Sequence, residues 1–160
     1  MSEIAQTPEP EADAKERLRL WLRLLKISRR IEADLRDRLR REFGTTLPRF
    51  DVMAALNQHE KGLKMSVLSG VLKVSNGNVT GIVDRLVEDG MIIRVPVPGD
   101  RRASLVRLTR NGREEFARQA VAHEGWIDQL LRDFTGAEAE GISVRLDHII
   151  QAIEQQEGGK

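Results

Sequence analysis

The 160-residue chain contains no cysteine and no tyrosine, and aromatic residues make up only 4% of it. Without cysteine there are no disulfide bonds, no thiolate ligands for a metal and no cysteine nucleophile. With so few aromatic rings, the core has to be built from leucine, isoleucine, valine and alanine, a composition that favours helices. Hydrophobic residues nevertheless reach 40%, which is enough for a packed domain of ordinary size.

Long apolar runs and targeting signals are also missing. No run approaches the roughly 20 residues that are needed to cross a bilayer. The first residues, MSEIAQTPEPEADAKE, are acidic and polar, unlike a secretory or mitochondrial signal. We therefore expect a cytoplasmic protein with no membrane partner, and we interpret residues 1–12 as a disordered tail.

The net charge of +1 conceals a separation of charge along the chain. Residues 15–113 carry a net charge of +11, and the segments on either side are acidic. The densest cationic stretch, residues 94–113, has six arginines and one acid. A local cationic surface attracts nucleic-acid phosphates whatever the charge of the whole protein. Ordinary solvated charge on helix surfaces is the alternative explanation.

The spacing of apolar residues predicts a mainly α fold with a small antiparallel β-hairpin. Residues 13–44 carry two adjacent apolar stripes on a helix too long for a small core to cover, so we expect a dimerisation helix there. Residues 45–112 are predicted to form three shorter helices and a two-stranded ribbon, and residues 113–157 two C-terminal dimerisation helices. Pro96 indicates that the first ribbon strand has one unpaired edge.

Two of the short helices, joined by the tight turn Leu72-Lys73-Val74, form a candidate helix-turn-helix. The second of them begins SNGNVTG, from Ser75 to Gly81. These short polar side chains suit a major groove, where asparagine can pair with adenine through two hydrogen bonds. A hairpin turn at Asn76-Gly77 is the alternative, but the flanking residues have helical periodicity.

The turn of the ribbon reads PGDRR, which places Arg101 and Arg102 beside Asp100. An arginine pair on a projecting turn can enter the DNA minor groove, where the negative potential is strongest over narrow A·T tracts. We expect Asp100 to hold one guanidinium in a fixed orientation. The alternative is a solvated, charged hairpin that protects a sheet edge.

Together, the segments VDRLVEDGMIIR, DRR and VRLTRNG resemble the DNA-binding core of the multiple-antibiotic-resistance regulator (MarR) family. The resemblance implies a winged helix-turn-helix, homodimers with interlocked first and last helices, and a pseudo-palindromic site on double-stranded DNA. It implies wing contacts from Asp100, Arg101 and Arg102. On the recognition helix, it implies DNA contacts from Ser75, Asn76, Asn78, Val79, Thr80 and Arg85. The chain departs from the family at Gly81, where members often carry a basic residue.

The resemblance also implies release from DNA by a small effector, a small aromatic acid or an aryl-CoA (acyl-CoA) thioester as in regulators of aromatic-acid catabolism. The expected pocket lies near the first, second and fifth helices, where cations and flat faces are available. The candidate residues are Ser28, Arg29, Arg49, Phe50, His123 and Trp126. The alternative is that Phe50 and Trp126 belong to the core and that Arg29 and Arg49 are ordinary surface residues.

No set of residues indicates catalysis, a metal or a cofactor. The three histidines lack metal-ligand spacing, and the chain has neither a phosphate-binding loop nor a nucleophile elbow. We therefore expect an effector-responsive repressor that is not an enzyme. A helical protein-interaction module without DNA binding is the alternative, but it leaves the arginine-rich ribbon without a role.

Overall fold

The computed structural model describes the backbone of residues 10–72 and 76–159. Side chains are described for residues 11–72 and 78–159. The contacts within the chain define two compact units. The first ends at His123, and the second begins at Glu124. The elements, in order, are α1 (Pro10–Phe43), α2 (Leu47–Asn57), β1 (Leu63–Lys64), α3 (Met65–Leu72), α4 (Asn76–Glu88), β2 (Ile92–Val97), β3 (Asp100–Leu108), α5 (Arg110–Leu130) and α6 (Gly136–Gly158). This is the predicted fold class, mainly α with a small antiparallel sheet.

Helix α1 begins earlier than the sequence predicted. Residues 10–12 are helical and do not belong to a tail, and residues 1–9 of the predicted tail lie outside the described part of the chain. Acids in the first turn, Glu11 and Asp13, and basic residues in the last turn complement the helix dipole. The helix ends before Gly44, whose φ of 61° lies in the left-handed region that glycine adopts readily.

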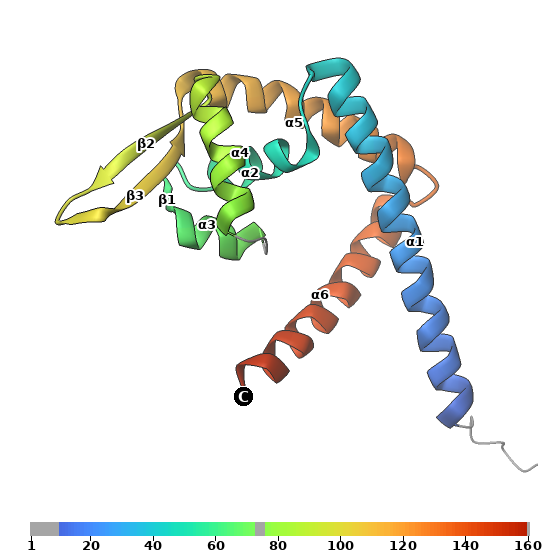
Figure 1. Ribbon diagram of the computed structural model, residues 1–160. Coiled ribbons are helices and arrows are strands. Elements are labelled where there is room, and N and C mark those ends of the chain that lie inside the picture. The colour runs from blue at the N-terminus through green and yellow to red at the C-terminus, as the bar shows by residue number, and fades with distance from the viewer. Residues whose placement is uncertain (1–9, 73–75, 160) are drawn as a thin grey trace, which may run out of the picture. The chain divides into compact units, whose positions relative to one another are not determined.

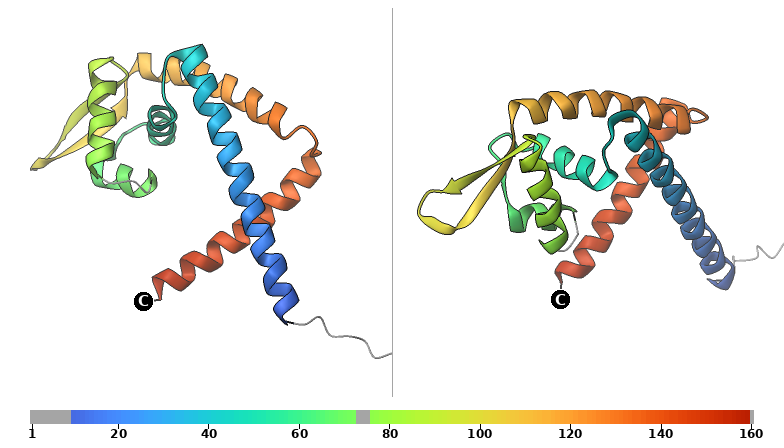
Figure 2. Two further views of the ribbon diagram at one scale, coloured as in Figure 1. Left: turned by 45° about the vertical axis from the view of Figure 1, so that its right-hand side comes forward. Right: turned by 45° about the horizontal axis from the view of Figure 1, so that its top comes forward.

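The core of the first unit lies between α2, α3, α4 and the sheet, which group together in Figures 1 and 2. Thr46 caps α2 by accepting a hydrogen bond from the Arg49 backbone, and Pro48 occupies the first turn. The side chains that are almost completely buried are aliphatic, as the shortage of aromatic residues required. They include Leu39, Val52, Met53, Leu56, Leu68, Val79, Val83, Leu86, Ile92 and Val106.

The sheet has three antiparallel strands in the order β1-β3-β2. The predicted ribbon is β2 and β3, and β2 lies at the edge, so the inference from Pro96 is confirmed. Strand β1 was not predicted, because two residues are too few to show an alternating pattern. Gly62 precedes β1 with a φ of 95°, and a Cβ there would lie 2.8 Å from the Val106 carbonyl oxygen.

The motif VRLTRNG forms the joint between the sheet and α5. The backbone N–H of Thr109 donates to Met91 O at 3.0 Å, and the Thr109 hydroxyl donates to Gly90 O at 2.6 Å. The same hydroxyl accepts from the Gly112 N–H at 3.0 Å, so Thr109 caps α5. A Cβ on Gly112 would lie only 2.0 Å from Met91 O. Glycine is therefore required there for α5 to approach the base of β2.

The second unit contains the end of α5 from Glu124 and all of α6. Thr135 and Glu138 form a capping box at the start of α6, with Glu138 N–H donating to the Thr135 hydroxyl and Thr135 N–H to the Glu138 carboxylate. Helix α5 ends at Leu130. None of the helices in the described ranges combines the length and apolarity that a membrane span requires.

The joint at Gly112 predicts a large loss of stability for Gly112→Ala. The added methyl group would overlap the Met91 carbonyl, so α5 or the base of β2 has to move, and we expect the free energy of unfolding to fall by about 2 kcal/mol or more. The measurement is urea denaturation at fixed protein concentration.

The matched control is Gly125→Ala in the same helix, where a Cβ meets nothing within 4 Å. This change should stabilise the protein by up to about 1 kcal/mol through helix propensity. Equal effects of the two substitutions would contradict the role assigned to Gly112.

Candidate nucleic-acid interface

Helix α4 carries the predicted recognition residues, and the structure exposes some of them to solvent. The side chains of Asn78, Thr80 and Arg85 are exposed. Ser75 lies outside the described residues, as does the side chain of Asn76, which begins the helix. Asparagine, threonine and arginine all have donors that can reach base edges or phosphates.

The prediction that Val79 faces bases is wrong. Its side chain is completely buried, with 0% exposure, as are the side chains of Val83 and Leu86 on the same stripe. These three residues follow the spacing of four and three that places side chains on one face of a helix. Val79 therefore anchors α4 in the core and is unable to touch a base without leaving it.

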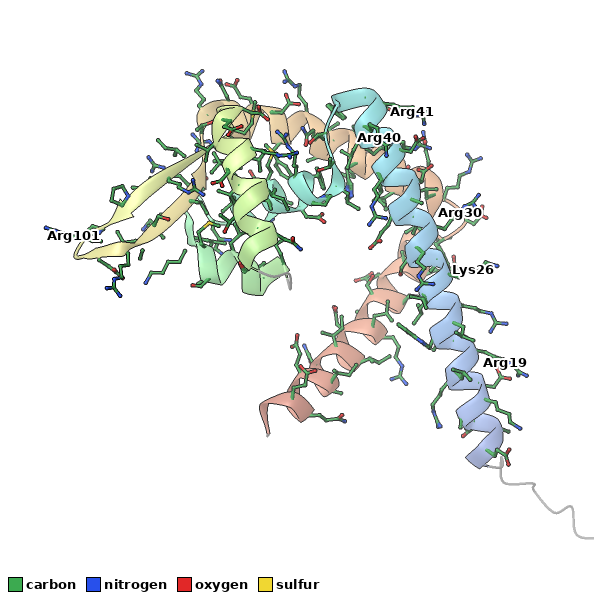
Figure 3. All side chains as sticks on the ribbon, viewed as in Figure 1. Arg19, Lys26, Arg30, Arg40, Arg41 and Arg101 are labelled. Carbon is green, nitrogen blue, oxygen red and sulfur yellow. The ribbon has the colours of Figure 1, made fainter. Side chains whose placement is uncertain are left out.

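The β2–β3 hairpin projects from the first unit beyond α4 (Figure 1), and Arg101 lies at its tip (Figure 3). The turn uses Gly99 at a φ of 81°. Asp100, Arg101 and Arg102 are all exposed. The expected pairing of Asp100 with a guanidinium is wrong, because Asp100 Oδ1 accepts a hydrogen bond from the backbone N–H of Arg102 at 3.0 Å. The carboxylate thus shapes the turn and leaves both arginine side chains pointing into solvent.

Two ion pairs between separate elements hold α4 and its C-terminal end. Arg94 on β2 pairs with Asp84 on α4, and Arg49 on α2 pairs with Asp89, which follows α4 directly. The partners are 10 and 40 residues apart in the sequence. No periodicity or local motif connects residues at such separations, so the sequence analysis missed both pairs.

A pocket of about 490 Å³ opens between α2 and α4. Its polar lining includes Thr46, Arg49, Asn78 and Arg85. Arg49 Nε is buried there without a hydrogen-bond partner among the described residues. A buried donor with no acceptor carries a free-energy cost.

The other predicted effector residues do not gather at this pocket. Phe50 is buried, and its ring stacks on His123 at 4.7 Å between centroids and contacts Phe116 at 5.4 Å. The core alternative therefore holds for Phe50. Ser28 and Arg29 are exposed on α1, and Trp126 is buried in the second unit.

His123 and Asp51 have shifted pKa values, and partial burial is the largest cause of each shift. Burial lowers the pKa of His123, and the nearby Asp51 opposes this shift. Burial also raises the pKa of Asp51, with repulsion from Glu32 in the same direction and attraction from His123 and Arg36 against it. In each case burial favours the neutral form. His123 is thus better suited to packing on Phe50 than to binding a carboxylate as a cation.

A helix-turn-helix core beside a projecting hairpin defines the winged helix-turn-helix class of proteins. The model of the MarR family matches residues 45–104. The transcriptional activatory protein BadR of Rhodopseudomonas palustris is 36% identical over 131 residues, which span 78% of this chain and 73% of BadR. The family model covers the helix-turn-helix, the recognition helix and the wing as far as residue 104.

Solved structures agree. A MarR family transcriptional regulator from Silicibacter pomeroyi shares 35% identity and a TM-score of 0.73, covering 88% of this chain and 97% of that one. A mutant of MarR from E. coli, solved with operator DNA, has the same fold, with a TM-score of 0.72, 24% identity and coverage of 84% and 95%. The chain belongs to the MarR family of transcriptional regulators.

Proposed function

We propose that this regulator binds a pseudo-palindromic DNA operator as a homodimer, represses transcription there, and is released by a small anionic effector. The observation that carries DNA binding is the joint presentation of two exposed polar elements by the first unit. One is the face of α4 with Asn78, Thr80 and Arg85, and the other is the wing tip with Arg101 and Arg102.

The two elements suit the two grooves of duplex DNA. A major groove admits an α-helix, and Asn78 and Thr80 provide the hydrogen-bonding groups that discriminate between base pairs. A narrow minor groove attracts arginine, so a hairpin with two adjacent arginines at its tip fits beside the helix. Two copies would place their recognition helices about 34 Å apart, one turn of DNA.

We predict that the protein represses transcription, because a dimer that covers a promoter excludes polymerase from it. The relative BadR is described as activatory, so transcription in vitro from a promoter that contains the selected site provides the direct test. Loss of transcript on addition of the protein supports repression, and a gain contradicts it.

The wing arginines generate the first functional prediction. The probe is a duplex selected by the protein from a random-sequence DNA pool, and its Kd is measured from 50 to 200 mM salt. Arg101→Ala with Arg102→Ala should weaken binding at least tenfold. The plot of log K against log salt should flatten by about 3 to 4, since a dimer loses four cations at roughly 0.9 each.

The control is Arg118→Gln with Arg132→Gln, which removes two exposed cations outside the wing and α4. These changes should leave the salt slope nearly unchanged. If the control flattens the slope as much as the wing variant does, the wing has no special part in binding. If the pool yields no selected duplex, the protein-interaction alternative takes the place of DNA binding.

The terminal helices support the homodimer. Residues 17–31 of α1 carry six cations and no acid, and large apolar side chains lie exposed among them. Figure 3 shows Arg19, Lys26 and Arg30 along this helix. On α6, acidic residues predominate and no residue is buried, and Ile142, Val144, Ile149, Ile150 and Ile153 are exposed. Exposed apolar faces of this extent mark protein contacts.

Because the proposed dimer buries these apolar faces, a charge placed on one of them should produce monomers. Trp21→Glu and Ile150→Glu, at side chains that are 55% and 51% exposed, should each raise the dimer dissociation constant at least tenfold. Sedimentation equilibrium provides the measurement. Val67→Glu on α3, at a side chain 47% exposed, is the control and should leave the dimer intact. Equal sedimentation of all three variants with the wild type would argue against the terminal helices as the interface.

The pocket between α2 and α4 is the site that we propose for the effector. Its volume is that of an ordinary small-molecule site. Arg85 supplies positive charge for a carboxylate or phosphate, and Arg49, which pairs with Asp89, supplies guanidinium donors beside it. The effector class remains the one predicted from the sequence, a small aromatic acid or its CoA thioester. An effector bound against α4 changes the surface that DNA contacts, so the two ligands favour different states of the protein.

The effector prediction uses benzoate and benzoyl-CoA as probes in thermal unfolding. At a concentration 100 times its Kd, a probe that binds only the folded protein adds about 2.7 kcal/mol of stability and raises Tm. Arg49→Gln should abolish this increase relative to its own ligand-free Tm, whereas Arg29→Gln on exposed α1 should retain it. No increase with either probe would rule out this effector class and leave DNA binding unaffected.

A further inference from the structure

The ion pairs of the described residues fall into two groups. Most join residues three or four positions apart within one helix, as in Arg110–Glu114. Two join separate elements, Arg49–Asp89 and Arg94–Asp84, and both hold α4 or its C-terminal end. Arg94–Asp84 is the pair that connects the recognition helix to the wing.

Asp84 lies on the exposed side of α4 next to the residues proposed to meet DNA. It follows Thr80 by one helical turn, and its side chain is 48% exposed. Val79 and Val83, the residues that precede Thr80 and Asp84, point into the core. A carboxylate in this position repels DNA phosphates unless a cation neutralises it.

Arg94 lies near the base of the wing, opposite Val106 on β3. From Val95 to the tip, the β2 backbone pairs only with β3 among the described residues, so the projecting part of the hairpin is held by what fixes its base. The guanidinium of Arg94 reaches across to Asp84 and connects that base to the helix. A small rotation there would move the arginine tip by a larger distance.

Stability alone gives little reason for this pair. Both side chains are more than one third exposed, and such pairs contribute about 0–1 kcal/mol to folding. Its effect on geometry is larger, since a helix and a wing that enter two different grooves have to keep a fixed relative orientation. The pair also neutralises the negative charge that lies one turn from Thr80.

We propose that Asp84 and Arg94 form a positioning pair that sets the wing against the recognition helix, and that discrimination between specific and non-specific DNA depends on it. The inference rests on the proposed function, since it concerns DNA contacts by α4 and the wing. Asp84 acts through Arg94 and the hairpin rather than by touching a base.

The test is whether Asp84→Asn strengthens or weakens the binding of DNA. Removing a negative charge from a DNA-facing surface ought to tighten binding to any duplex. A positioning role requires the opposite result on the selected duplex, with binding weaker by about fivefold. On a scrambled duplex of the same composition, binding should be unchanged or tighter.

Glu88→Gln is the matched control for this charge. Glu88 is exposed one turn further along α4 and has no ion pair within the described residues. Its replacement removes the same charge with no pair to break, so binding to both duplexes should be unchanged or slightly tighter. If Asp84→Asn behaves like Glu88→Gln on the selected duplex, the proposal is overturned.

Arg94→Gln and the variant that combines it with Asp84→Asn complete a double-mutant cycle. Arg94→Gln should weaken binding to the selected duplex about tenfold, and adding Asp84→Asn should cause little further loss because the same interaction is already absent. Hydroxyl-radical footprints should show reduced protection where the wings lie, with Tm nearly unchanged. Multiplicative losses would instead identify Arg94 as an independent phosphate contact and overturn the pair.

Measurement of DNA binding by the wild-type protein distinguishes failure of the proposed function from failure of the positioning pair. If the wild-type protein selects no duplex, the proposed function fails before the pair is examined. If it selects one and Asp84→Asn leaves the ratio of specific to non-specific affinity unchanged, only the positioning pair fails.

Discussion

The buried stripe of α4 is the constraint on which the rest of the first unit depends. Val79, Val83 and Leu86 are inaccessible to solvent or nearly so, and they fix the rotation of the helix about its own axis. That rotation leaves Asn78, Thr80 and Arg85 exposed. It also explains why one predicted contact was wrong, since a helix is unable to bury Val79 and present it to DNA. Packing thus selects which polar side chains are available for recognition.

The wing is held by backbone contacts at its base and shaped by one side chain at its tip. At the base, Gly112 allows α5 to approach Met91 O, and Thr109 bonds to the same loop. At the tip, Asp100 accepts from the Arg102 backbone, which frees both arginine side chains. Arginines on a floppy hairpin would lose conformational entropy on binding, whereas a fixed hairpin has lost most of it during folding. For the proposed wing contact, a fixed hairpin would therefore favour DNA binding.

Local patterns predicted most of the elements, and non-local contacts account for what was missed. Helix periodicity and the edge strand marked by Pro96 are confirmed, because each depends on neighbouring residues. The caps at Thr109 and Thr135 are local in the same sense. Strand β1 exists only through its pairing with β3, and the Arg94–Asp84 pair only through the fold. The effector candidates scattered for the same reason, since residue type alone does not place Phe50 and Arg29 in one pocket.

Helix α1 connects the proposed dimer contact to the DNA-binding core without a break. Its first half carries exposed apolar side chains, and its last turns bury Leu35 and Leu39 in the first unit. Only the three residues Gly44 to Thr46 separate it from α2, and Gly44, Thr46 and Arg49 line the proposed effector pocket. A ligand there would contact the link between α1 and α2 and, on its other side, the recognition helix α4. Binding at this joint would therefore alter both the spacing of the two α4 helices in a dimer and the surface that each presents, which is the differential interaction that effector release requires.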